Sequence, residues 1–236
     1  MNKTTIYLLF LLCITLASAF VSCDTLSKVG SDMEGTIVFD VSYPYETPSV
    51  MMDLYPKEMT VAFKDHKVHA SLKSSYDMLT TDFIVDHSKK EFVQLLKNMS
   101  TRSAMRMNEQ ETATWFNDIM LYQLEKTEET KQICGYNCTK TIAHPADPSK
   151  PSIEIYATRD IGIEDSNWWN PFRGIDGFMM AYDIEQYGIC MRMQARQVTF
   201  EKLDPSEFDI PENYTTVDSR LMKELLSDVV ATYIKD

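Results

Sequence analysis

Apolar and polar side chains alternate with a period of two along much of the chain beyond residue 36. In the first such segment, residues 37, 39, 41 and 43 are apolar and would share one face of a strand. Polar residues at 65–67 and 87–89 separate neighbouring segments in the manner of turns. The pattern predicts β-strands in these segments: 37–43, 59–63, 68–72, 83–85, 92–95, 153–156, 178–184 and 189–195.

The last two segments read as a hairpin with one apolar face and one polar face. Residues 178, 180, 182 and 184 share a face, as do residues 189, 191, 193 and 195, and Tyr187-Gly188 supplies the turn. Arg192, Gln194 and Arg196 point the other way. One solvent-exposed face is typical of an antiparallel sheet. We therefore expect a mainly β fold of the α+β class.

Two segments show helical spacing instead. Residues 109–121 place Ala113, Phe116 and Met120 on one side, with acidic residues in the first turn. Apolar residues between 221 and 234 recur every three or four positions, and Asp218 or Ser219 can cap the start of this C-terminal amphipathic helix. Its polar face is not basic, which favours docking on the protein over lying on a membrane surface.

Residues 1–22 have the pattern of a secretory signal peptide. Lys3 precedes an apolar run over 6–16, and mostly small residues follow over 17–22. The run is shorter than the ~20 residues that a membrane-spanning helix needs. An uncleaved anchor helix is the alternative interpretation.

Cys23 closes a sequence, Phe20-Val21-Ser22-Cys23, that resembles a lipobox, with Phe20 where Leu is usual. The resemblance implies lipidation of Cys23, cleavage before it and acylation of the new amine, and two or more acyl chains anchor a protein stably. We therefore expect a bacterial lipoprotein with a tether over residues 23–32. Cleavage after Ala19, which would leave Cys23 an ordinary thiol, is the alternative.

The formal net charge of −12 limits the partners of the chain. Such a surface disfavours binding to nucleic acid and to anionic lipid headgroups. Contact with the membrane is therefore expected to come from the lipid anchor and not from a basic patch.

Three cysteines remain beyond Cys23, in a compartment that permits disulfides. Cys134 and Cys138 flank three residues that look like a hairpin turn, so a Cys134–Cys138 bridge is one option. A Cys138–Cys190 bridge and three unpaired thiols are equally allowed, because spacing does not fix connectivity.

Motifs that carry chemistry are absent from the sequence. There is no nucleophile elbow, phosphate-binding loop or zinc-protease motif. His66 and His69 would tend to opposite faces of a strand, and Cys134 and Cys138 have no second ligand pair at zinc spacing. We expect no enzyme activity, no metal and no cofactor.

The most informative segment lies between the strands at 153–156 and 178–184. It concentrates aromatic residues and glycines in a long connection, which reads either as a loop held by its own aromatics or as a rim over an apolar cavity. Methionine, with 15 residues, adds adaptable apolar surface. The expected rim residues of a ligand cavity are Trp168, Trp169, Phe172, Phe178 and Met180.

Four pieces in order, 35–40, 133–140, 160–178 and 209–214, resemble an envelope family of Bacteroidota known as a domain of unknown function, DUF4412. The resemblance covers residues 33–214, and the family looks related to the LolA/LolB-like lipoprotein carriers. It implies an incomplete antiparallel β-barrel with a few helices around an apolar cavity. The helix over residues 215–236 lies outside the resemblance.

Together these features predict a non-enzymatic lipoprotein of the bacterial cell envelope. We expect it at the outer membrane, on the periplasmic or the surface face, binding an apolar ligand such as a lipid or a lipoprotein acyl chain. The alternative is a packed envelope domain that serves as a protein-protein interaction or assembly partner.

Overall fold

The computed structural model describes residues 33–46, 50–99, 101–117, 122–163, 165–186 and 189–233. The expected signal peptide, Cys23 and tether lie outside these residues, as does the predicted turn at Tyr187-Gly188. The statements that follow concern the described residues.

One sheet accounts for the strands, and its order is β12-β6-β5-β4-β3-β2-β1-β11-β10-β9-β8-β7. The strands are β1 (Gly35–Ser42), β2 (Glu58–Lys64), β3 (Lys67–Lys73), β4 (Leu79–Asp86), β5 (Glu91–Asn98), β6 (Thr101–Asn108), β7 (Tyr122–Ile133), β8 (Tyr136–Pro145), β9 (Ile153–Thr158), β10 (Phe178–Gln186), β11 (Ile189–Phe200) and β12 (Thr215–Thr216). The helices are α2 (Glu109–Asn117) and α3 (Ser219–Tyr233), with short 3₁₀ turns η1 (Val50–Leu54), η2 (Ser75–Asp77) and η3 (Pro205–Phe208).

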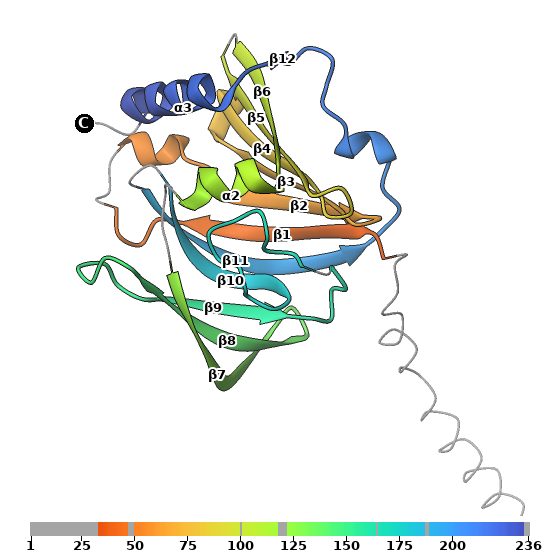
Figure 1. The fold of residues 1–236 in the computed structure, drawn as a ribbon, viewed down its shortest axis with the longest axis vertical. Helices are drawn as coiled ribbons and strands as arrows, with labels where there is room; N and C mark the ends of the chain where they lie inside the picture. Colours follow the sequence, from red (N-terminus) through yellow and green to blue (C-terminus); the bar gives the residue numbers. More distant parts are fainter. Residues whose placement is uncertain are drawn as a thin grey trace, which may run out of the picture.

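The sheet is antiparallel except where β12 runs parallel to β6. The N-terminal strand β1 lies in its middle, paired with β2 on one side and β11 on the other. Its outer strands, β12 and β7, do not pair with each other, so the sheet stays open. Figure 1 shows the sheet curving around α2 and the β9–β10 connection, with α3 across one end. The strand order and the open sheet confirm the prediction of a mainly β fold with an incomplete barrel.

The main core lies on the concave face. Ile37, Phe39 and Val41 of β1 are buried there, as their alternation predicts. The helices contribute to the same core through Phe116 of α2 and through Met222, Leu226 and Val229 of α3. The docked face of α3 is the apolar face predicted from its spacing. The predicted helix over 109–121 ends at Asn117 in the structure, and residues 118–121 lie outside the described part.

A smaller core covers the outer face of β2–β6. Phe208 of η3 packs there with Ile84, Val93 and Leu95, and Leu203 and Ile210 flank it. Since both faces of β5 are covered, Phe92–Leu96 is buried without alternation. The chain after β11 therefore crosses the back of the sheet before β12 and α3.

The geometry of the β7–β8 hairpin argues against the Cys134–Cys138 bridge, one of the three options left open by the sequence. The turn has two residues, Cys134 and Gly135, with φ angles of 51° and 85°. Ile133 faces Tyr136, so Cys138 faces Lys131 and not Cys134. Cys134 is exposed, Cys138 is buried, and these two thiols and that of Cys190 are free. A three-residue turn would have placed Cys134 and Cys138 opposite each other, and the two-residue turn removes that geometry.

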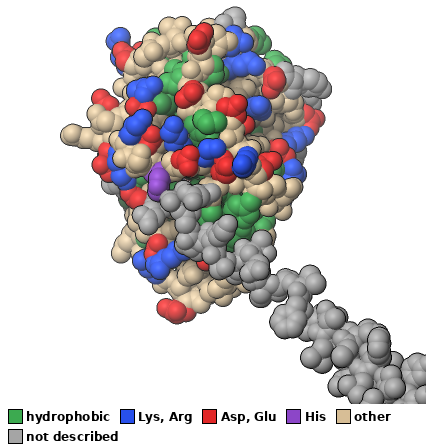
Figure 2. Space-filling view, turned by 90° about the vertical axis from the view of Figure 1, so that its right-hand side faces the viewer, with side chains coloured by type: hydrophobic (Ala, Val, Ile, Leu, Met, Phe, Trp, Pro, Cys, Tyr) green, Lys and Arg blue, Asp and Glu red, His purple; other side chains and the backbone are tan. Residues whose placement is uncertain are grey.

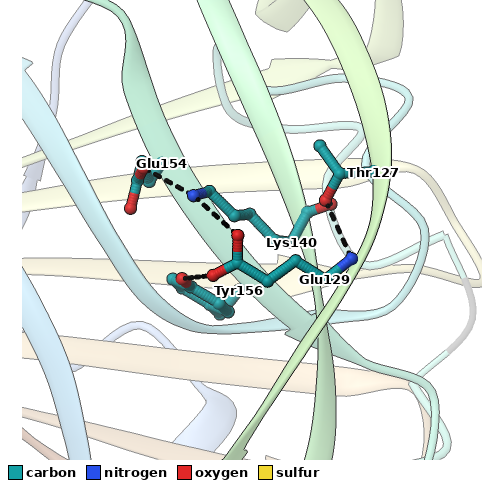
Figure 3. A network of polar contacts seen from close by, with 5 residues as sticks. All are labelled: Thr127, Glu129, Lys140, Glu154 and Tyr156. Carbon is teal, nitrogen blue, oxygen red and sulfur yellow. Dashed lines mark hydrogen bonds and ion pairs between the residues drawn. The ribbon is translucent and has the colours of Figure 1, made fainter.

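A network of polar side chains joins β7, β8 and β9 (Figure 3). Lys140 pairs with Glu129 at 3.1 Å and with Glu154 at 2.6 Å, and the Tyr156 hydroxyl donates to Glu129 at 2.9 Å. The two carboxylates raise the pKa of Lys140. Thr127 donates to the Lys140 carbonyl at 2.9 Å, where the β7–β8 register shifts. The network thus fixes the position of the irregularity in the edge strand.

Charges elsewhere on the surface are mixed. On the face shown in Figure 2, basic and acidic side chains interleave, with small apolar areas between them. Pairs such as Arg192–Asp183 at 2.8 Å and Arg196–Asp40 at 3.1 Å lie on the outer faces of β10 and β11 or β1 and β11. This face therefore shows no extended field of one sign.

Candidate functional site

The connection between β9 and β10 folds into the curve of the sheet, and we call residues 159–177 the plug loop (Figure 1). Asn167 holds its two ends together, because its amide donates to the carbonyls of Ile175 at 3.0 Å and Gly177 at 2.8 Å. Asn170 donates to Asn167 at 3.1 Å and accepts from the Phe172 N–H at 2.9 Å. Both asparagines are buried, so the loop is pinned by a satisfied polar network.

Aromatic rings of the plug loop fasten it to the sheet on two sides. Trp169 stacks on Phe92 with ring centroids 5.8 Å apart and lies 6.0 Å from Phe83. Phe172 is fully buried between Tyr122, at 5.0 Å, and Tyr182, at 6.2 Å. The plug loop is therefore part of the core and also divides the space above the concave face.

The first cavity lies between the plug loop and the concave face and has a volume of about 80 Å³. Trp169, Asn170 and Pro171 of the plug loop cover it, together with Phe116 of α2. Its floor comes from strands at both ends of the chain: Phe39, Met59, Val61, Val68, Ala70, Leu72, Phe83, Phe178, Met179, Tyr182, Ile184, Met191 and Met193.

The second cavity, of about 130 Å³, lies beneath α3. Leu226, Val229 and Val230 of α3 form its roof. Tyr43 and Tyr55 form one wall, with their rings 5.0 Å apart, and the Tyr43 hydroxyl donates to the Pro56 carbonyl at 2.8 Å. A tyrosine is uncharged at neutral pH, and burial raises the pKa of Tyr43 further above its ordinary value.

The two cavities are neighbours along one apolar track. Leu72, Phe83, Gln186 and Met191 line both of them and form the wall between them. Pockets for drug-sized ligands usually enclose ~300–1,000 Å³, so each cavity alone is smaller than that. Their arrangement, two small spaces in line, matches a slender ligand better than a compact one.

The structure separates the five predicted rim residues into two groups. Trp169 and Phe178 line the first cavity. Trp168, Phe172 and Met180 do not line either cavity and are buried at 5 % exposure or less. For these three the rim prediction is wrong, because the plug loop turns inward and uses them as core.

Sequence reasoning missed the residues that shape the track most. The sequence analysis placed Leu72, Phe83 and Gln94 only as members of predicted strands and singled out none of them. Methionine was a better signal: Met59, Met179, Met191 and Met193 line the first cavity, and Met78 lines the second. Thioether side chains adapt to irregular apolar shapes, which suits walls of this kind.

Ionisable groups are not gathered at the track. Within the described ranges, no group of three or more His, Cys, Asp or Glu residues has a metal-binding arrangement. His87 is a buried titratable residue beside the plug loop, edge-on to Trp168 with ring centroids 6.4 Å apart, and burial lowers its pKa to about 4. The arrangement can exclude water and hold apolar groups, and the polar groups on the described cavity walls are hydroxyls, amides and an indole N–H.

In the described part of the chain, neither helix combines the length and the apolar character needed to cross a bilayer.

Comparison with known proteins gives similarity of fold without a family. No family model and no curated protein sequence matches the chain. The solved structure of PNGF-II matches 82 % of this chain at 16 % identity with a TM-score of 0.51, and this chain spans about a third (32 %) of that protein's length. A beta-barrel-like DUF1849 protein from Brucella abortus matches 72 % of this chain and 99 % of its own at 6 % identity and a TM-score of 0.36. The MucA/MucB complex of Pseudomonas aeruginosa matches 81 % of this chain and 60 % of its own at 10 % identity and a TM-score of 0.34. The similarity to PNGF-II extends to the fold alone, and the DUF4412 and LolA/LolB relationship stays a prediction.

Proposed function

We propose that this protein is a lipid-anchored envelope lipoprotein whose open barrel binds a slender apolar ligand, such as an acyl chain, along the two neighbouring cavities. The observation that carries the proposal is the continuity of their lining through Leu72, Phe83 and Met191. Burial of each methylene of a chain in such a lining is worth about 0.8 kcal/mol. The signal peptide and Cys23 lipidation expected from the sequence belong to the same proposal, as does a LolA/LolB-like origin of the barrel.

Binding of a long chain requires some opening of the track. The cavities of about 80 and 130 Å³ are separated by side chains, and α3 and the plug loop cover them. Met191 and Leu72 belong to the wall shared by the two cavities, so rotamer changes of these side chains are the proposed way in which the spaces join. Methionine, unbranched and flexible, changes shape at low cost.

Replacement of Ala70 by phenylalanine is expected to abolish ligand binding. Ala70 is buried in β3 and lines the first cavity, so a phenyl ring there fills space that the ligand would use. Overpacking costs about 1–3 kcal/mol, which leaves a folded protein if the parent has ordinary stability. The readout is fluorescence of N-phenyl-1-naphthylamine bound to the protein, with displacement by decanamide.

The matched control is Thr60→Phe, which adds the same ring to the outer face of the neighbouring strand β2. Thr60 alternates with the cavity residues Met59 and Val61, so this change should leave dye binding at the parental level. Equal dye binding by the parent and the Ala70→Phe variant would contradict a ligand site in this track. Mass spectrometry of protein purified gently from membranes adds the test of a co-purifying ligand.

A second candidate function rests on a different hollow. A groove of about 650 Å³ lies between β6 and the first turns of α2 and α3, with Met105, Met107 and Trp115 in its floor. Its rim is polar, which is typical of a protein-protein interface. If the protein is an assembly partner, Trp115→Ala should weaken capture of a cross-linked envelope partner and leave dye binding unchanged.

A further inference from the structure

We infer that the ligand carries an uncharged hydrogen-bonding group next to its apolar chain, such as an ester, an amide or a hydroxyl, and that Gln94 binds that group. This inference rests on the proposed function, because it names the class of ligand that the same track would select. It excludes a free fatty acid anion as the preferred ligand.

The first argument is the absence of charge on the walls. Among the described residues that line the two cavities there is no Lys, Arg, His, Asp or Glu. A carboxylate buried there would lose its hydration and gain no cation as a partner. The desolvation free energy of such an unpaired charge is large and unfavourable. The walls therefore discriminate against an ionised head group while they accept its neutral counterparts.

The second argument is the position of Gln94. It lies in the middle of β5, opposite Phe83 of β4 and Met105 of β6, and only 3 % of it is exposed. Its neighbours on the same side of the strand, Phe92 and Leu96, belong to the main core. A glutamine in such a place normally satisfies its amide by hydrogen bonds to the protein.

The Gln94 amide does not have such partners. Its side chain lines the second cavity and makes no hydrogen bond to any residue that the structure describes. An unpaired buried amide is destabilising, so its presence on an apolar wall is explained if a ligand group supplies the missing partner. A carboxamide offers both a donor and an acceptor, which matches the carbonyl of an ester or amide as well as a hydroxyl.

Gln186 is placed to act with Gln94. It is half-buried at the end of β10, lines both cavities and likewise makes no side-chain hydrogen bond to a described residue. Gln94 and Gln186 are the two side-chain amides that line the second cavity. The Ser74 hydroxyl of that wall already accepts from the Leu79 N–H at 2.9 Å, and the Trp169 indole N–H is an unpartnered donor on the wall of the first cavity. A head group between the two amides would leave its chain to run past Met191 toward the first cavity.

The test compares ligands that share one chain and differ at its end. Decane, decanamide, methyl decanoate and decanoate compete for the bound N-phenyl-1-naphthylamine at pH 8, where the carboxylate is ionised. We expect decanamide and methyl decanoate to compete at concentrations about tenfold or more below that of decanoate, because only decanoate must bury a charge.

The variant Gln94→Met tests the residue. It keeps the length of the side chain and removes the amide, so decanamide should lose roughly fivefold in affinity while decane is unaffected. The thermal midpoint of the ligand-free variant should rise, because an unpaired polar group has left the interior. Gln197→Met, on the exposed part of β11, is the matched control and should behave like the parent.

The outcomes separate the inference from the proposed function. If none of the four compounds displaces the dye, ligand binding in the track fails altogether. If decanoate competes as well as decanamide, or Gln94→Met keeps the parental ratio of decanamide to decane affinity, the track binds apolar chains and the selection of a neutral head group is wrong.

Discussion

The Phe172→Ala variant should lose about 3–5 kcal/mol of unfolding free energy, the largest effect that we expect from a single substitution in this protein. Phe172 is fully buried, and its ring lies between those of Tyr122 and Tyr182. Removing it leaves a cavity where the plug loop meets β7 and β10, and the Asn167–Asn170 network cannot close that space. Chemical denaturation followed by tryptophan fluorescence measures the change.

Trp169→Ala in the same loop is the informative comparison. Trp169 is only partly buried and lines the first cavity, so its loss should cost less stability and should change dye binding more. A Phe172→Ala protein as stable as the parent would show that the plug loop does not form part of the core. It would then fit the interpretation of this segment as a rim over an apolar cavity, and not as a fixed divider of the interior.

Eight of the twelve strands that the structure describes, β1–β5 and β9–β11, could be predicted because their signal is local, whereas β6 and β12 were not predicted and β7–β8 was predicted only as a hairpin turn. β1 buries residues 37, 39 and 41 as their alternation requires, and the β2–β3 turn falls at Asp65 and His66, whose φ angles of 46° and 64° fit a two-residue hairpin. The docked face of α3 also follows from its spacing. In each case, residues close in sequence decide the structure.

The parts that could not be predicted depend on distant segments. The sequence does not show which face of β5 Gln94 occupies, because both faces are covered: Val93 and Leu95 pack with Phe208 on the outer face, and Gln94 lies on the inner face. Cys134 adopts a positive φ that a non-glycine residue rarely takes, so its place inside the turn was not evident. The cavity exists because β11 returns to pair with β1, which no local pattern encodes.

The protein should also lose stability as the pH falls from about 6.5 to about 4, through His87. Only 8 % of His87 is exposed, and burial lowers its pKa to about 4, while interaction with Asp165 partly opposes that shift. In the unfolded chain the pKa is about 6.5, so between these values the unfolded state binds the proton and the folded state does not. Stability therefore rises with pH across this window, by up to about 3 kcal/mol in total.

The contribution of His87 to the pH dependence of stability can be separated by comparing the parent with a His87→Gln variant. Carboxylates also titrate toward pH 4, so the quantity to measure is the parental unfolding free energy minus that of His87→Gln at each pH. That difference should fall as the pH drops from 6.5 to 4, and it should be constant above pH 6.5. His66→Asn is the control, since His66 is exposed in the adjacent turn and asparagine tolerates its φ of 64°. A His87→Gln protein with the parental pH slope would refute the assignment. Because the His87 ring lies edge-on to Trp168, confirmation would mean that a proton on a buried imidazole beside the plug loop destabilises the folded protein.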